Sequence, residues 1–136
     1  MGWTEASSLR VIVADDDASV RERIRRALSA AADLELIAMA RDGAEAWRTA
    51  LELSPDVLVL DDSLPIVDGL DVLARLRTEA PDIRIVMHVE NPANCIDAAE
   101  LGATGCVSKG WPLDALLSTI RAAGGAARDS QEGRRR

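Results

Sequence analysis

Acidic side chains are concentrated at two places in the chain, each directly after a short apolar run, and the only lysine follows a third such run. The residues are Asp15, Asp16 and Asp17 at the first place, Asp61 and Asp62 at the second, and Lys109 at the third. Carboxylates are ligands that Mg²⁺ prefers, and a carboxylate can also act as a nucleophile. If these groups meet, the site would suit phosphoryl transfer onto an aspartate, because the metal and the ammonium group offset the charge of the phosphoryl oxygens.

Each acidic run alone has a simpler interpretation. Residues 15–17 could form a solvated turn in which one acid caps the next helix, and residues 61–62 could form an ordinary polar loop. The joint placement favours a site. Several carboxylates held close together raise a pKa sharply or destabilise the fold unless a cation lies among them. We therefore expect Mg²⁺ and Lys109 to provide the counter-charges.

The alternation of apolar runs with amphipathic stretches is typical of a parallel α/β sheet. The expected strands are 9–14, 34–39, 56–60, 83–89 and 104–108. The first expected helix starts at Ser19, which forms a capping box with Glu22, and the next two start after Gly43 and near Leu70. The last two expected helices cover 93–101 and 112–123. Strands that are apolar on both faces need helices on both sides of the sheet. The sequence thus predicts a doubly wound α/β fold with five parallel strands and five helices, whose functional residues lie beyond the carboxyl ends of the strands.

Composition limits the classes of function. The chain has 136 residues, enough for one domain, and a net charge of −7, which disfavours binding to nucleic acid by this domain. It contains neither a secretory signal nor an apolar stretch of the ~20 residues that a membrane helix needs. Cys95 and Cys106 imply no disulfide framework, so we expect a reducing cytoplasm and two small core-filling thiols.

Three segments carry a resemblance to a known family. They are PDVLVLDDSLPIVDG at 55–69, VADD at 13–16 and GATGCVSK at 102–109. In these segments the chain resembles the receiver domain of bacterial two-component response regulators, the CheY-like fold. The resemblance implies the flavodoxin-like strand order 2-1-3-4-5. It covers residues 9–124, which leaves 1–8 as an N-terminal extension and 125–136 as a flexible tail or linker.

The resemblance also implies a role for each site residue. Asp61 would be the phosphoacceptor, and Lys109 would bind the phosphoryl group. Mg²⁺ would be bound by Asp15, Asp16, Asp61 and the backbone carbonyl of Ser63. The implied partner is a histidine kinase or phosphotransfer protein, and the implied dimer contact is the face formed by the fourth helix, fifth strand and fifth helix.

Two positions depart from the family pattern. Family members usually carry Ser or Thr at the end of the fourth strand, but counting forward from Asp61 leads to Val89 and counting back from Lys109 leads to Met87. Members also usually carry an aromatic residue three positions before the lysine, where this chain has Cys106 and contains no Tyr or Phe at all. The chain therefore keeps the transfer chemistry and lacks the usual relay of the phosphorylation signal.

Three further polar residues have no implied role. Asp17 and Asp62 are expected to be solvated loop acids. His88 could donate a hydrogen bond to phosphate, but strand alternation turns it away from the site if Val89 faces the site, and we expect it to pack.

The favoured function is a phosphorylatable, stand-alone receiver that signals through protein–protein contacts and is not a turnover enzyme. The alternative is a pseudo-receiver, a binding or dimerisation module that does not respond to phosphate, because the hydroxyl and the aromatic ring are absent. A Mg²⁺-dependent phosphatase with an aspartate nucleophile is disfavoured, since such enzymes usually need a second acid where this chain has Ser63.

Overall fold

A computed structural model describes residues 8–135 of the chain and the side chains of residues 8–125. The elements, in chain order, are β1 (Leu9–Ala14), α1 (Ala18–Ser29), β2 (Leu34–Ala40), α2 (Gly43–Leu53), β3 (Val57–Asp61), α3 (Gly69–Glu79), β4 (Arg84–Val89), α4 (Asn94–Glu100), β5 (Gly105–Ser108) and α5 (Leu113–Arg135). The strands form one parallel sheet in the order β2-β1-β3-β4-β5. The predicted fold class and strand order are confirmed.

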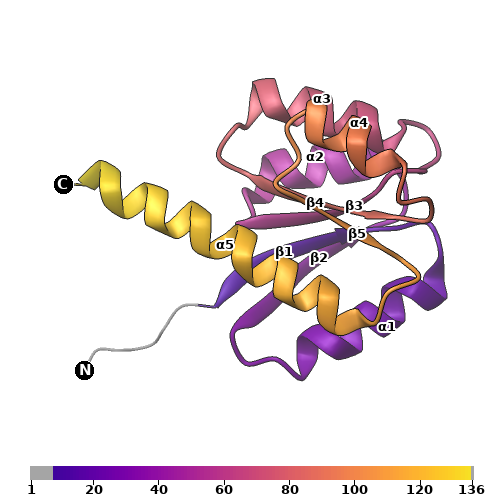
Figure 1. Cartoon of the computed structure of the whole chain (residues 1–136), viewed down its shortest axis with the longest axis horizontal. Helices are drawn as coiled ribbons and strands as arrows, with labels where there is room; N and C mark the ends of the chain where they lie inside the picture. Colours follow the sequence, from indigo (N-terminus) through magenta and orange to yellow (C-terminus); the bar gives the residue numbers. More distant parts are fainter. Residues whose placement is uncertain (1–7, 136) are drawn as a thin grey trace.

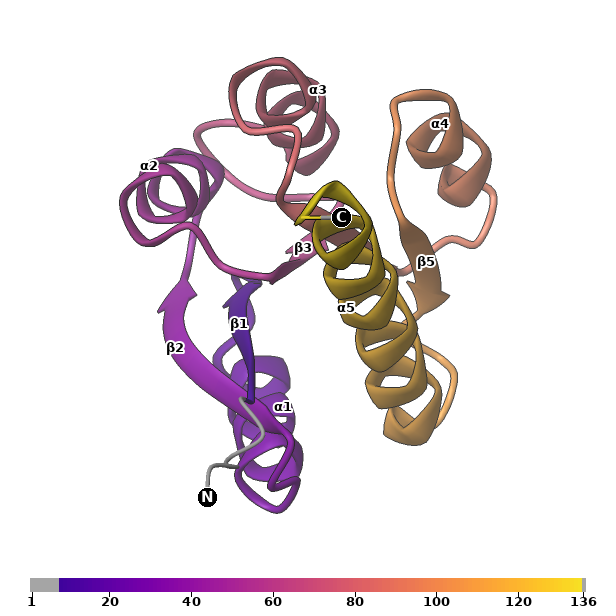
Figure 2. The same ribbon diagram turned by 90° about the vertical axis from the view of Figure 1, so that its left-hand side faces the viewer.

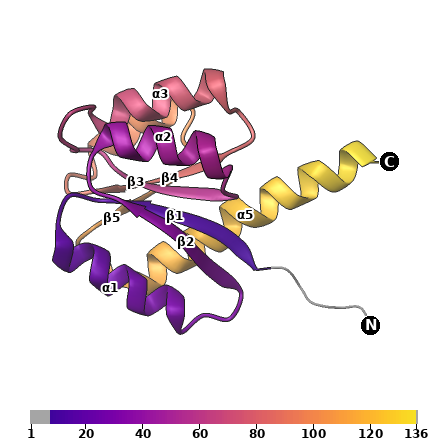
Figure 3. The same cartoon turned by 180° about the vertical axis from the view of Figure 1, so that it is seen from behind.

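Helices cover both faces of the sheet, as the apolar strands require. Figure 1 shows α2, α3 and α4 on one face and α1 with α5 on the other, and Figure 3 shows the same layers from behind. The residues of β3 divide accordingly: Leu58 and Leu60 pack into the core beneath α2 and α3, while Val57 and Val59 pack into the core beneath α1 and α5. This two-sided burial fixes β3 at the centre of the sheet.

The start of α1 differs from the predicted capping box. Asp17 is the N-cap residue, and its carboxylate accepts a hydrogen bond from the backbone N–H of Ser19 at 2.8 Å. Ser19 lies inside the helix, and Glu22 pairs with Arg25 and Arg26 instead of reaching back to the helix start. The N-cap lies two residues earlier than predicted because Asp is at least as good an N-cap as Ser.

The last helix is longer than expected. We expected it to end near Ala123 and expected 125–136 to be a flexible tail, whereas α5 continues to Arg135 and projects past the end of the sheet (Figure 1), so that its C-terminal end points toward the viewer in Figure 2. Two glycines in a row favoured an end at Gly124, but the alanine, arginine, glutamine and glutamate residues that follow are good helix formers. Gly124 also lies directly on the side chain of Leu9, where a Cβ atom would come within 2.4 Å of a methyl group.

The two cysteines form a disulfide, which corrects the expectation of separate thiols. Cys95 in α4 and Cys106 in β5 have Cα atoms 5.7 Å apart, within the range that a disulfide spans. Their spacing in the chain gave no sign of this pairing, because it arises when α4 folds back beside β5. None of the helices within residues 8–135 combines the length and the hydrophobicity needed to span a bilayer.

Candidate functional site

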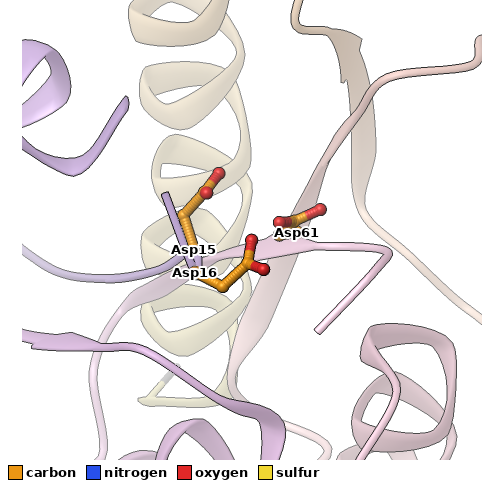
Figure 4. Close-up of side chains that lie close together, drawn as sticks. All are labelled: Asp15, Asp16 and Asp61. Carbon is orange, nitrogen blue, oxygen red and sulfur yellow. The ribbon is translucent and has the colours of Figure 1, made fainter. Parts of the chain in front are cut away.

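The three strand ends predicted to carry the chemistry meet at one edge of the sheet. Asp15 directly follows β1, Asp61 is the last residue of β3, and Lys109 directly follows β5. Because β1 and β3 are hydrogen-bonded neighbours, their carboxyl ends place Asp15 and Asp16 beside Asp61 (Figure 4). The sheet topology thus brings together residues separated by more than forty positions in the sequence.

Three carboxylates at this edge could hold a metal ion. One oxygen each from Asp15, Asp16 and Asp61 lie within 4.8 Å of one another. Asp15 and Asp61 are buried, whereas Asp16 is exposed, so the cluster opens to solvent on one side. An all-oxygen cluster that is open on one side fits Mg²⁺, which binds a few carboxylates and keeps several waters.

Lys109 lies between the two buried carboxylates. Its Nζ atom is 2.9 Å from Asp15 Oδ2 and 3.1 Å from Asp61 Oδ2. The neighbouring strand holds it there, since the backbone N–H of Lys109 donates to the carbonyl of Val89 at 2.7 Å. The ammonium group therefore partly neutralises a charge cluster that would otherwise destabilise the fold.

The electrostatic environment raises the pKa of Asp61. Burial is the main cause and raises this pKa to about 7, while the hydrogen bond from the Ser63 N–H and the charge of Lys109 oppose the rise. Burial acts against the charge of Lys109, but hydrogen bonding and attraction to Asp15 and Asp61 leave its pKa raised. Asp61 is thus a carboxyl group whose proton a nearby cation would readily displace.

Backbone hydrogen bonds orient the acidic side chains. Asp15 accepts from the N–H of Asp17 at 2.9 Å, and Asp61 accepts from the N–H of Ser63 at 3.1 Å. Asp17 caps α1, so it is neither an unassigned loop acid nor part of the carboxylate cluster. These bonds fix the side chains before any ligand arrives.

A cavity of about 230 Å³ opens over the carboxylate cluster. Its walls are formed by Asp16, Asp17, Val20, Asp61, Ser63, Glu90 and Lys109. This volume is sufficient for a small anion such as a phosphoryl group. Sequence reasoning missed Glu90, although it directly follows β4 and therefore lies at the same sheet edge as the other site residues.

Asp62 is buried, which corrects the expectation of a solvated loop acid. Only 6% of it is exposed, and its Oδ2 atom accepts a hydrogen bond from the side-chain amide of Asn94, the first residue of α4. Asp62, the residue after Asp61, is thereby hydrogen-bonded to the start of α4.

His88 and Val89 point to opposite faces of β4, but His88, the register partner of Asp61, is the one on the Asp61 face of the sheet, and Val89 faces away. Val89 packs with Met87 in the core beneath α2, α3 and α4. His88 is buried, makes no hydrogen bond through Nδ1 to the residues described, and is absent from the walls of the cavity. Burial, followed by the charge of Lys109, lowers the pKa of His88 to about 4, so the imidazole is neutral at physiological pH.

Comparison with known proteins assigns the family. Residues 11–121 match the family described as the response regulator receiver domain, and the chain belongs to it. A relative from Myxococcus xanthus, named protein-glutamate methylesterase/protein-glutamine glutaminase 5, is 38% identical over 90% of this chain and 39% of its own length. The response regulator MprA of Mycobacterium ulcerans is 35% identical over 85% of this chain and 50% of its own length.

A solved structure agrees with this assignment. The response regulator domain of Thermotoga maritima CheB has a TM-score of 0.80 and 30% identity, and the match covers 87% of this chain and 97% of that one. The chain spans half or less of the length of the two curated relatives named above.

The relatives overturn one expectation. We expected a protein with no enzymatic activity, yet several matched relatives, including those from Myxococcus xanthus and Caldanaerobacter subterraneus, carry an enzyme's name. Sequences similar to this receiver domain therefore occur in proteins named as enzymes. The site residues of the domain did not justify the expectation that the protein is not an enzyme. The part of those relatives that this chain matches is 39% and 28% of their length.

Proposed function

We propose that this receiver domain accepts a phosphoryl group on Asp61, with Mg²⁺ held by Asp15, Asp16, Asp61 and the backbone carbonyl of Ser63. Lys109 binds the transferred group. The observation that supports this most is the position of Lys109 Nζ, within 3.1 Å of Asp61 and 2.9 Å of Asp15 at the wall of a small open cavity.

The chain's own groups account for most of the transfer. The ionised carboxylate of Asp61 attacks the phosphorus atom, an O–P bond forms, and the bond to the donor breaks with its electron pair leaving on the donor. Lys109 shifts from the Asp61 carboxylate to an oxygen of the phosphoryl group, where it offsets negative charge. Mg²⁺, when bound, supplies further positive charge at the same oxygens.

The donor in this proposal is a histidine kinase or phosphotransfer protein, and the output is a protein–protein contact. The α4-β5-α5 face is the proposed surface for a homodimer, and Ile96, Leu101 and Trp111 are exposed apolar residues on or next to its elements. The proposal places the protein in the cytoplasm and takes residues 9–124 as the receiver unit.

A small-molecule phosphodonor tests the proposal. Incubated with Mg²⁺ and acetyl phosphate, the full chain is expected to gain the mass of one phosphoryl group, whereas Asp61→Asn gains none. Asp62→Asn is the matched control, because it changes the adjacent acid and leaves the nucleophile in place; it is expected to be labelled like the wild type. An unlabelled wild type, or a labelled Asp61→Asn variant, would contradict the proposal.

A second function is supported by the end of β4, where none of Met87, His88 and Val89 carries a hydroxyl group, and by Cys106, which stands where the family usually has an aromatic residue. It is a pseudo-receiver whose binding is independent of phosphate. Sedimentation with and without beryllofluoride and Mg²⁺ separates the two: a change in association state supports switching, and identical association with bound beryllofluoride supports the pseudo-receiver.

A further inference from the structure

The disulfide between Cys95 and Cys106 lies where α4 meets the sheet. We propose that these cysteines form a reversible thiol–disulfide site whose oxidation state decides how firmly α4 is held against β5. This site is distinct from the carboxylate cluster and does not depend on phosphorylation of Asp61.

The helix α4 has few other attachments. It spans only seven residues, lacks a side-chain hydrogen bond at its N-cap, and has Ala98 as its one buried residue. Ile96, in the same helix, is 67% exposed. A helix of this length is marginal without tertiary contacts, so a covalent bond at its second residue contributes much of what holds it in place.

The cysteines lie at the border between the core and the surface. Both are partly exposed, in contrast to the completely buried residues Met87 and Val89 in the core cluster against which they pack. Thiol–disulfide exchange requires access to a sulfur atom, and a disulfide at the border between core and surface meets this requirement better than one sealed in the core.

Both ends of the disulfide adjoin residues next to the acidic site. Asn94, immediately before Cys95, donates to the carboxylate of Asp62, which follows the phosphoacceptor. Cys106 lies on β5, three residues before Lys109. When the disulfide is reduced, only non-covalent contacts hold α4, among them the packing of Ala98 and Cys95 against the core and the Asn94–Asp62 hydrogen bond, so the redox state of the pair changes the support of a residue beside Asp61.

The proposed oxidant is a low-molecular-weight disulfide, and the reductant is the corresponding thiol. One cysteine thiolate attacks the small disulfide, forms a mixed disulfide and releases one small thiolate, which takes a proton. The second cysteine thiolate attacks the mixed disulfide and releases the other small thiol. The two cysteines lose two electrons and two protons in total, and one small disulfide becomes two thiols.

Hydrogen–deuterium exchange of the full chain tests this proposal, with oxidised and reduced glutathione as the redox probes and no phosphodonor. Oxidised glutathione is expected to consume both thiols, as counted by alkylation and mass, and reduced glutathione to restore them in native buffer. Amides of α4 are expected to exchange about tenfold faster or more in the reduced protein, while those of α3 remain unchanged.

Variants distinguish the effect of the disulfide on α4 from a general loss of folded structure. The double variant Cys95→Ser/Cys106→Ser is expected to show rapid α4 exchange in both buffers, with a circular dichroism spectrum like that of the wild type. Asn94→Ala keeps the disulfide and is expected to keep the redox response, and Asp61→Asn is expected to respond as the wild type does, which makes the outcome independent of the phosphoacceptor.

Three results would overturn the proposal. They are two free thiols remaining after treatment with oxidised glutathione, equal α4 exchange in the two redox states, and a redox-dependent change that persists in the double cysteine variant.

Discussion

Three consecutive aspartates at the end of β1 have three different environments. Asp15 is 1% exposed and pairs with Lys109, Asp16 is exposed and joins the carboxylate cluster, and Asp17 caps α1. The chain leaves an extended strand at Asp15 and enters a helix at Ala18, so successive side chains point in different directions. The three aspartates therefore have different roles, because the backbone changes from strand to helix between Asp15 and Ala18.

Substitution of the adjacent acids should separate metal binding from stability. We expect Asp16→Asn to weaken Mg²⁺ binding strongly and to leave the free energy of unfolding nearly unchanged. We expect Asp17→Ala to lower the free energy of unfolding by about 1 kcal/mol, the usual loss for an N-cap, and to keep Mg²⁺ binding. Calorimetric titration with Mg²⁺ and urea unfolding measure the two effects, and the reverse pattern would contradict the assigned roles.

The loop between β3 and α3 depends on a glycine at the start of the helix. The backbone N–H of Gly69 donates to the carbonyl of Asp62 at 3.1 Å, and a Cβ atom at this position would lie 1.9 Å from the carbonyl oxygen of Asp61. The loop therefore folds back so closely on the end of β3 that only a residue without a side chain fits. This close approach holds the backbone on either side of Asp61.

Two glycine substitutions test this dependence at the level of the elements. We expect Gly69→Ala to lower the free energy of unfolding by about 2 kcal/mol or more and to weaken Mg²⁺ binding, because the added methyl displaces the backbone at Asp61. Gly125→Ala is the matched control, since its Cβ would meet nothing within 4 Å in the helix α5. We expect it to raise the free energy of unfolding by up to about 1 kcal/mol through helix propensity, as urea unfolding would show. A Gly69→Ala protein as stable as the control would contradict the close approach.

Two buried groups give the whole molecule opposing dependences on pH. Burial raises the pKa of Asp61 to about 7, so its favourable contribution to stability is present at acid pH and is lost as the pH rises through about 7. Burial lowers the pKa of His88 to about 4, so the unfolded chain takes up the proton first and stability falls as the pH decreases from about 6.5 to about 4. Between these limits the two effects act against each other.

Substitution of Asp61 should leave the pH dependence of stability that His88 causes. In the absence of divalent cations, we expect the free energy of unfolding of Asp61→Asn to rise more steeply with pH than that of the wild type between about pH 4.5 and 6.5, by up to about 1.4 kcal/mol per pH unit. Urea unfolding across this range measures both slopes. Parallel curves for the two proteins would show that Asp61 does not carry a raised pKa.

Much of the fold and site could be predicted because the relevant signals are local. The apolar run before Asp61 marked a strand buried on both faces, and the chain order of strands and helices indicated a doubly wound sheet. Asp15, Asp16, Asp61 and Lys109 could be assigned to one site because the carboxyl ends of parallel strands share an edge. The end of α5 was missed because helix formers after Gly124 outweigh the glycines.

The sequence by itself determined the class of fold and the acidic composition of one sheet edge, since strand periodicity and the residues after each strand are properties of short segments. Only the tertiary structure decided that Cys95 pairs with Cys106, that Asp62 and His88 are buried, that Glu90 lines the cavity, and that Lys109 bridges Asp15 and Asp61. Each of these depends on the distance between segments far apart in the chain, and that distance is fixed by packing rather than by local pattern.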